Sequence, residues 1–390
     1  MRLLDRLVVC LYVALAALPV IAMLRGWRDH RLDGAVPAPP RPALALAAVR
    51  SEDYQGKFAA WFDVAHGLRS WEIWIDNTML YHAFGDTRFG SHVVVGGDGV
   101  AFEQDDISYF NKSGTELPAD GAFDALAGRI AALQRRLARD HRALVPMFVP
   151  SKTTIYPDAV PAEWTRALGS PRPSTERVYL AMKRALDAHG VAYVDGIALL
   201  QARPEPRDVL WGPSARHFSE YAACLCTREV VGRYAELTGR PAFDYPCQVA
   251  LQKADRRQRD LDLFRLLNAW RTRHDMIQRA SRHDPLPAPL PADRPDGAPS
   301  ALWIASSFGW VTMDDAAASR RFGQLHLDYY HSSVHPQGSY WQFNAAQRDA
   351  TWRSVFLTRD VYILELLETY LEPGYFGAAA IDAISAELGP

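Results

Sequence analysis

The 390-residue sequence has little cysteine, lacks a CxxC pair and carries almost no excess of charge. Without a CxxC pair, a zinc or thioredoxin-type site is not expected. Lys and Arg total 43 against 45 Asp and Glu, so the formal net charge is −2. That balance excludes a strongly basic nucleic-acid binder as the default interpretation. We also find no internal repeats.

The composition that is present is typical of a globular chain. Apolar residues make up 48% and charged residues 23%, which is unlike the profile of a disordered chain. The length is enough for one large domain or two ordinary ones, with a sizeable core in either case.

The amino terminus contains the longest apolar run. Residues 7–24 carry no charge and are flanked by arginines on both sides. A helix of this length spans roughly 27 Å, about the thickness of a bilayer core. A signal anchor and a cleaved signal peptide both fit; the length of the run favours the anchor. We therefore expect an anchor with the rest of the chain exported.

The four cysteines are compatible with one disulfide in an exported domain. Cys10 lies in the apolar run, whereas Cys224 and Cys226 stand two apart in an expected helix and so point in different directions. Either of these two could bridge to Cys247 in an oxidising compartment.

Two proline-rich segments divide the remaining chain. Residues 34–47 form a Pro/Ala linker, and residues 284–299 contain six prolines and indicate a surface loop. Between and after them, helical and strand patterns alternate, which predicts a parallel sheet covered by helices on both faces. The helices are expected over 123–137, 175–188, 218–237 and 255–282, and the strands over 143–149, 191–194, 301–304 and 361–364.

Ligands of such folds bind beyond the carboxyl ends of the strands, so the residues directly after strands are the candidates. The apolar strand at 301–304 runs into Ala305-Ser306-Ser307. A nucleophilic serine needs a sharp turn at a strand end, where its hydroxyl is exposed and backbone N–H groups can face an oxyanion. Such a serine is more often a simple helix cap.

His217 is the second candidate. It follows a Gly-Pro breaker and precedes the helix expected from Phe218. The positive end of a helix dipole favours a neutral imidazole, which is the form that acts as a base.

Four motifs together resemble the SGNH-hydrolase-like exopolysaccharide O-acetyltransferases of the alginate AlgX/AlgJ type. They are VVVGGDGVAFEQDDISYF at 93–110, LVPMFVPSKTTIYPDAVP at 144–161, the segment around His217 and the segment around Ser307. The resemblance covers residues 50–370. It implies an SGNH-like α/β fold with Ser307 as nucleophile and His217 as general base, which pass an acetyl group to a sugar hydroxyl.

The sequence departs from that family at its catalytic motifs. The family's Asp two residues before the His is Ala215, and the Gly and Asp before the nucleophile are Ala305 and Ser306. Loss of the triad carboxylate typically costs about 10⁴ in kcat. Asp208 is the expected substitute, with Glu220 as an alternative. A slow enzyme, a dyad enzyme and a catalytically dead relative all remain open.

Further residues are expected to bind substrate. Lys152 follows a strand, and the segment 325–341 carries aromatic side chains, among them Tyr330 and Trp341, that could line a carbohydrate groove. The three histidines of this segment lack paired carboxylates at metal-ligand spacing, so we expect neither a metal nor a cofactor.

The sequence therefore predicts an anchor or signal peptide at 1–33, a linker at 34–50, an SGNH-hydrolase-like domain at 51–375 and a tail at 376–390. The expected function is O-acetylation of an exopolysaccharide or surface glycan from the periplasmic side of the inner membrane, with a membrane-bound O-acyltransferase as partner. The alternative is an inactive SGNH-like scaffold or glycan-binding component of a polysaccharide export complex.

Overall fold

A computed structural model gives the structure of the chain. It describes residues 3–27, 32–34, 37–44, 52–85, 87, 92–112, 117–165, 172–253, 261–270, 278–281, 297–337 and 352–389. Two compact units are present, the first formed by residues 1–93 and 263–272 and the second by 94–262 and 273–390.

The first unit is helical and begins with the apolar run. Its helices are α1 (Leu3–Leu24), α2 (Glu52–Ala65) and α3 (Arg69–Phe84). Residues Leu4–Leu24 have a mean hydropathy of 2.7 and are long and apolar enough to cross a membrane, a test that an N-terminal signal sequence also passes. The segment after residue 262 belongs to this unit through contacts such as the stacked rings of Trp74 and Trp270.

The second unit is built on a six-stranded sheet with the order β4-β3-β10-β7-β8-β9. The pairings along β4-β3-β10-β7-β8 are parallel, and β9 pairs with β8 in the antiparallel direction. The expected parallel sheet is therefore a mixed sheet with one antiparallel edge strand. The strands are β3 (Ala143–Val149), β4 (Val194–Asp195), β7 (Ala301–Ala305), β8 (Leu325–Tyr329), β9 (Ser333–Pro336) and β10 (Val361–Leu367).

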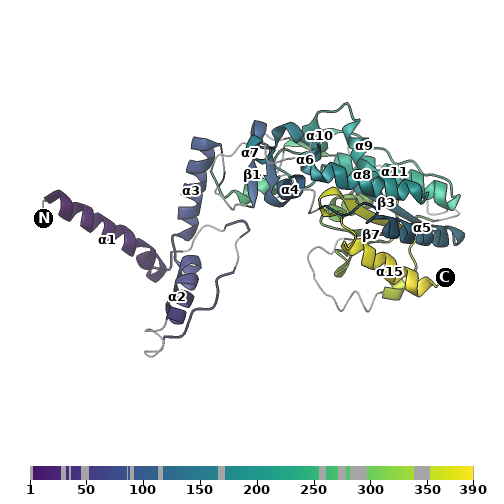
Figure 1. The fold of residues 1–390 in the computed structure, drawn as a ribbon. Coiled ribbons are helices and arrows are strands. Elements are labelled where there is room, and N and C mark those ends of the chain that lie inside the picture. Colours follow the sequence, from purple (N-terminus) through teal and green to yellow (C-terminus); the bar gives the residue numbers. More distant parts are fainter. Residues whose placement is uncertain are drawn as a thin grey trace. The chain divides into compact units, whose positions relative to one another are not determined.

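Both faces of this sheet are covered by helices, as Figure 1 shows for β3 and β7. Successive side chains of a strand point to opposite faces. In β3, Val145 and Met147 join the core beneath α11 and α13, whereas Leu144 and Phe148 join the core beneath α5, α8 and α15. The covering helices are α5 (Asp124–Arg139), α8 (Ser174–Ala188), α11 (Glu220–Thr238), α13 (Phe308–Ser319) and α15 (Phe376–Leu388).

Shorter elements connect these layers. The helices among them are α4 (Gln104–Phe110), α6 (Lys152–Ile155), α7 (Ala162–Thr165), α9 (Gly196–Gln201), α10 (Arg207–Leu210) and α12 (Asp262–Leu266), and the 3₁₀ turn η7 (Glu368–Tyr370) directly follows β10. Two small two-stranded sheets pair β1 (Val93–Val95) with β2 (Ala101–Glu103) and β5 (Ala250–Lys253) with β6 (Gln278–Ser281).

Two predicted elements differ in the structure. One helix is expected over 255–282. Among the described residues of that range, the regular elements are the short helix α12 and the strand β6. The expected tail at 376–390 instead forms α15, whose Ala380, Ile381 and Ile384 are fully buried in the core. Apolar side chains at helical spacing in this segment supply the burial that holds α15 on the sheet.

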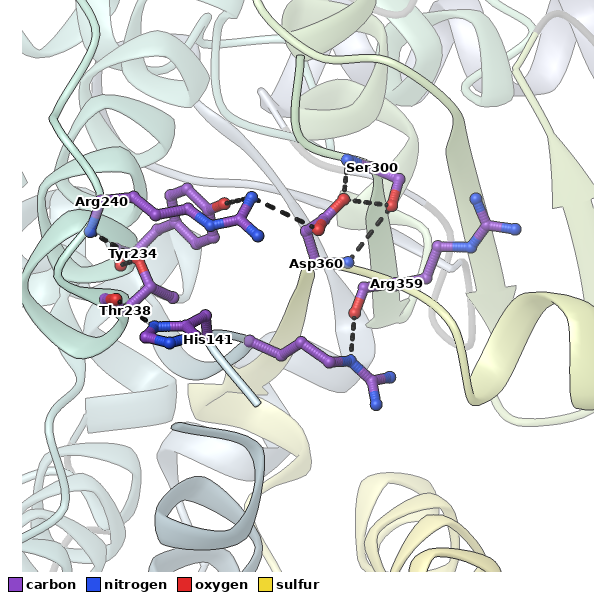
Figure 2. Close-up of polar contacts among 8 residues, drawn as sticks. His141, Tyr234, Thr238, Arg240, Ser300, Arg359 and Asp360 are labelled. Atoms are coloured by element: carbon purple, nitrogen blue, oxygen red, sulfur yellow. Dashed lines mark hydrogen bonds and ion pairs between the residues drawn. The ribbon is translucent and has the colours of Figure 1, made fainter. Parts of the chain in front are cut away.

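The amino ends of the central strands are joined by a polar network that Figure 2 shows in close-up. The carboxylate of Asp360, directly before β10, accepts hydrogen bonds from the backbone N–H and the hydroxyl of Ser300, both at 2.7–2.8 Å. Arg240, which follows α11, lies 3.6 Å from the same carboxylate and donates to the Tyr234 hydroxyl. These contacts stabilise the amino end of the sheet, opposite to the carboxyl ends of the strands.

Candidate active site

Ser307 stands where β7 ends and α13 begins. The buried strand carries the chain to Ala305, Ser306 is fully buried, and Ser307 occupies the N-cap position of α13. Its side chain makes no capping hydrogen bond to the helix. The Ser307 hydroxyl therefore does not cap α13 and can contact another group.

The turn around Ser307 depends on close packing of the helix on the sheet. A Cβ added to Gly309 would lie 2.6 Å from both Ala305 Cβ and Leu327 Cδ1. Only glycine fits such an approach, which brings the first turn of α13 against β7 and β8. The sharp strand-to-helix turn expected at this position is present.

His217 lies on a loop whose backbone is held by buried donors. The Trp211 indole donates to the Ala215 carbonyl at 3.1 Å, and the Lys152 ammonium donates to the Pro213 and Ala215 carbonyls at 2.7 Å each. Ser219 then begins α11 by accepting from the Ala222 N–H at 3.1 Å. This bonding fixes the loop from both sides of His217.

The two predicted residues meet, although 90 residues separate them in the chain. The His217 Nε2 atom lies 2.8 Å from the Ser307 Oγ atom, which is hydrogen-bond distance for a hydroxyl and an imidazole. The imidazole ring packs edge-on against Phe308, with 4.7 Å between ring centroids. Ser307 and His217 are both partly exposed, so the pair is open to solvent on one side.

A carboxylate stands on the other side of the imidazole. The Asp262 Oδ2 atom lies 3.5 Å from the His217 Nδ1 atom, and the Asp262 Oδ1 atom accepts from the Arg216 backbone N–H at 2.7 Å. Hydroxyl, imidazole and carboxylate thus follow one another in the order that a serine triad requires. Asp262 was missed by sequence reasoning, which placed it in a helix expected over 255–282 and gave it no role.

The predicted substitute carboxylate, Asp208, is not in this position. It lies exposed on α10, and its charge acts on the phenol of Tyr156. Glu220, the other alternative, is in the first turn of α11. Spacing along the chain could not find Asp262, because it comes from 45 residues beyond the histidine.

Lys152, predicted to bind substrate, lines the same small recess as Ser307. Its side chain is fully buried, and burial lowers the pKa of its ammonium group to about 7. The ammonium group donates to the Pro213 and Ala215 carbonyls, so it also supports the loop that carries His217.

Tyr330, predicted to contact substrate, lies near Ser307. It occupies the turn between β8 and β9 with a φ of 50°, and its phenol lies close enough to Ser307 to interact with it electrostatically. Burial raises the pKa of this phenol, so it stays protonated and can donate to an oxygen beside Ser307. The other aromatic residue predicted here, Trp341, lies outside the described residues.

Beside Ser307 is a narrow polar recess of about 10 Å³, room for about one water molecule. Arg216 forms an ion pair with Glu103 in its wall, and Asp106 lies close by. Burial raises the pKa of Glu103 to about 7 and that of Asp106 to about 6. Sequence reasoning did not single out these three residues.

The match to known families covers the part of the chain that supplies two of the three triad-like residues. Residues 93–286 match the model of the SGNH hydrolase-like domain of the acetyltransferase AlgX. The chain therefore belongs to the AlgX-type SGNH hydrolase-like family. The matched range contains His217 and Asp262 and ends before Ser307, which the geometry alone connects to them.

Solved structures similar to this AlgX-type chain share little sequence with it. The O-acetyltransferase domain of Pseudomonas putida AlgJ is 17% identical over 75% of this chain and 99% of its own, with a TM-score of 0.37. Pseudomonas aeruginosa AlgX is 11% identical over 76% and 67%, and Bacillus cereus PatB1 is 10% identical over 66% and 93%, both with TM-scores of 0.43. No curated protein sequence matches this chain.

The AlgX-type domain also contains a buried acid behind its nucleophile. Glu365 of β10 is buried and accepts hydrogen bonds from the backbone N–H and the hydroxyl of Ser306. Burial raises its pKa to about 7. Ser306 stands at the position where the family has Asp. Its hydrogen bonds to Glu365 connect the turn before Ser307 to the neighbouring strand β10.

Two further features bear on the chemistry. Cys224 and Cys247 form a disulfide between α11 and the segment that follows it. Within the residues that the structure describes, we find no group of three His, Cys, Asp or Glu side chains placed to hold a metal ion.

Proposed function

We propose that this protein is an O-acetyltransferase that acylates hydroxyl groups of a glycan outside the cytoplasm, with Ser307 as nucleophile and His217 as general base. The observation that carries the proposal is the 2.8 Å contact between the Ser307 Oγ atom and the His217 Nε2 atom at the carboxyl end of β7. The relationship to the AlgX-type acetyltransferases supports acetyl as the transferred group, and the resemblance to exopolysaccharide O-acetyltransferases supports a glycan as the acceptor.

The first half-reaction transfers the acetyl group to the enzyme. The Ser307 oxygen attacks the carbonyl carbon of an acetyl ester or thioester while His217 takes the hydroxyl proton. The tetrahedral intermediate collapses, the bond to the leaving group breaks, and His217 returns the proton to that group. An acetyl ester on Ser307 remains.

The second half-reaction follows the same path in reverse. His217 removes a proton from the sugar hydroxyl, whose oxygen attacks the acetyl-serine carbonyl, and the proton then returns to Ser307. Asp262 orients the imidazole and stabilises its charged form. The phenol of Tyr330, which lies near Ser307, would donate a hydrogen bond to the developing oxyanion.

The location is part of the proposal. The apolar helix α1 would hold the chain in the inner membrane as a single span, or would be removed as a signal peptide, with the catalytic unit in the periplasm. The disulfide between Cys224 and Cys247 supports an oxidising compartment. An acetyl donor then has to reach the periplasm, and a membrane-bound O-acyltransferase is the partner we propose for its delivery.

Hydrolysis of a chromogenic acetyl ester by the full-length chain, with water in place of the sugar, tests the proposal. We expect activity in the wild type and its loss in both Ser307→Ala and His217→Ala. Asp360→Asn is the matched control, because Asp360 lies at the opposite end of the sheet. Activity that survives both active-site substitutions would rule out the mechanism, and an absence of activity in the wild type would favour an inactive scaffold.

A further inference from the structure

A second cavity lies near the candidate active site, at the carboxyl end of β10. It has a volume of about 240 Å³ and is bounded by the end of α4, the first turn of α8 and the turn η7 that follows β10. Pockets for drug-sized ligands are about 300–1,000 Å³, so this one has room for a single ring. The residues of its wall that matter here are Tyr109, Ser174, Thr175, Glu368, Thr369 and Tyr370.

The cavity shares part of its wall with the recess beside the nucleophile. Thr369 and Tyr370 line both the cavity and the recess that contains Ser307. A ligand in the cavity is therefore separated from the nucleophile by the width of one or two side chains. An acceptor bound there has a neighbouring group within reach of an acetyl ester on Ser307.

Three polar atoms in the wall have no partner among the residues that the structure describes. They are the Ser174 hydroxyl, the Thr175 hydroxyl and the Oε1 atom of Glu368, and all three residues are nearly completely buried. The other carboxylate oxygen of Glu368 is satisfied by the Ser151 N–H at 2.8 Å and the Thr154 hydroxyl at 2.6 Å. Buried polar groups are normally hydrogen-bonded, so these orphaned atoms indicate that a polar ligand completes the site.

Two aromatic rings complete the wall. Tyr109 and Tyr370 pack edge to face with 5.5 Å between centroids, and the Lys112 ammonium lies over the Tyr109 ring at 4.0 Å. Rings beside unpaired hydroxyl and carboxyl groups suit a sugar, which presents apolar C–H faces and hydroxyl edges at once.

We propose that this cavity is a subsite for one neutral sugar residue of the acceptor glycan, adjacent to the residue that receives the acetyl group. The inference rests on the proposed transferase function and goes beyond it by naming the position and the charge class of the acceptor. Ser174, Thr175 and Glu368 would bind sugar hydroxyls, and Tyr109 and Tyr370 would pack on the ring.

The charges of the wall favour a neutral sugar over a uronic acid. Glu372 and Glu368 both line the cavity, and burial raises the pKa of Glu368 to about 7, so that near neutral pH part of it is protonated and can donate. Among the described residues that line this cavity, Lys112 is the one cation, and its ammonium group already lies over the Tyr109 ring. A uronate carboxylate would face acidic oxygens without a cation of its own.

Sugar binding to the full-length chain in lipid nanodiscs tests the subsite directly. Saturation-transfer NMR is recorded with the methyl glycosides of glucose, galactose, mannose and N-acetylglucosamine, and with that of glucuronic acid. At least one neutral glycoside should bind, and more tightly than the glucuronide. Failure of all four neutral glycosides to bind, or a preference for the glucuronide, overturns the proposal.

Variants locate the binding. Thr175→Val and Ser174→Ala should weaken glycoside binding at least tenfold. They should leave the melting temperature equal to or above that of the wild type, because the lost hydroxyls have no partner among the residues that the structure describes. The control Thr227→Val removes a buried hydroxyl that donates to the Ala223 carbonyl within α11, and it should leave binding unchanged. Binding that is unaffected by Thr175→Val and Ser174→Ala places the sugar elsewhere and refutes the subsite.

The same preparations separate this proposal from the transferase function. Hydrolysis of a small chromogenic acetyl ester needs Ser307 and His217 but no acceptor, so it is measured in the wild type and in Ser307→Ala beside the sugar binding of the wild type. If the wild type binds the sugar yet Ser307→Ala leaves hydrolysis unchanged, the transferase proposal fails and the subsite stands. If hydrolysis depends on Ser307 but no neutral glycoside binds, the subsite fails alone.

Discussion

Replacement of Asp262 by Asn probes the one member of the candidate triad that family motifs did not indicate. The substitution keeps the size of the side chain and removes its charge. Asp262 lies 3.5 Å from the His217 Nδ1 atom, where a full charge pair is worth about 5 kcal/mol at an effective dielectric constant near 20. Since the Asp262 side chain is 29% exposed, solvent screening reduces this to roughly half.

The resulting loss of 2–3 kcal/mol in transition-state stabilisation corresponds to a fall in kcat of about 10²-fold. The Michaelis constant for a small acetyl ester should change little, because Asp262 acts on the imidazole and does not touch the substrate. Steady-state hydrolysis of a chromogenic acetyl ester gives both parameters, and circular dichroism checks that the variant is folded.

Asp208→Asn is the matched control for this experiment. Asp208 is the carboxylate that the sequence analysis expected as a substitute for the family's Asp, yet it lies exposed on α10 and its charge acts on the Tyr156 phenol. It should keep the wild-type kcat. A kcat for Asp262→Asn within threefold of the wild type, or an equal loss in Asp208→Asn, would refute the assignment of Asp262 as the orienting acid.

Three further predictions concern the support of the site. Burial raises the pKa of Glu365 from an ordinary 4.5 to about 7. Between these pH values the native state holds a proton that the unfolded state has lost, so stability falls as the pH rises. Glu365→Gln should remove up to about 3 kcal/mol of that pH dependence, measured by urea titrations from pH 4.5 to 7.5. Replacing Cys224 and Cys247 by Ala opens a loop of 23 residues and should lower the unfolding free energy by about 3 kcal/mol, measured by urea titration without reductant, whereas an unchanged midpoint would show that the disulfide is not formed. Gly309→Ala places a methyl group 2.6 Å from Leu327 Cδ1 and should cost about 1–3 kcal/mol by the same titration, with a parallel loss of ester hydrolysis; wild-type stability would contradict the close packing of α13.

The central part of the fold could be predicted because its sequence patterns are strong. The buried strand at 143–149 agrees with β3 residue for residue, and the apolar spacing at 123–137 falls within α5, whose buried residues follow that spacing. The edge hairpin of β8 and β9 was not predicted, because the many His and Tyr residues of that segment resemble a binding loop. In the structure Asp328 of β8 is buried and pairs with His331 at 2.8 Å, so part of this polarity is satisfied internally.

The residues of the candidate site also divide into those that the sequence indicated and those that it did not. Ser307 and His217 stand next to strong local signals, a strand end and a helix start, and the structure brings them together. Asp262 and Glu365 act through contacts between segments that lie far apart in the chain. No local pattern encodes such contacts, and only the folded geometry reveals them.

The account as a whole depends on an acetyl group that is carried by Ser307. The most direct measurement is mass spectrometry of the full-length protein, mixed with a chromogenic acetyl ester, quenched in acid within the first turnover and digested. We predict one added acetyl group on the peptide that contains Ser307, in the wild type and not in Ser307→Ala. An unmodified peptide in the wild type, while ester hydrolysis proceeds, would contradict the mechanism, and so would acetylation confined to another residue.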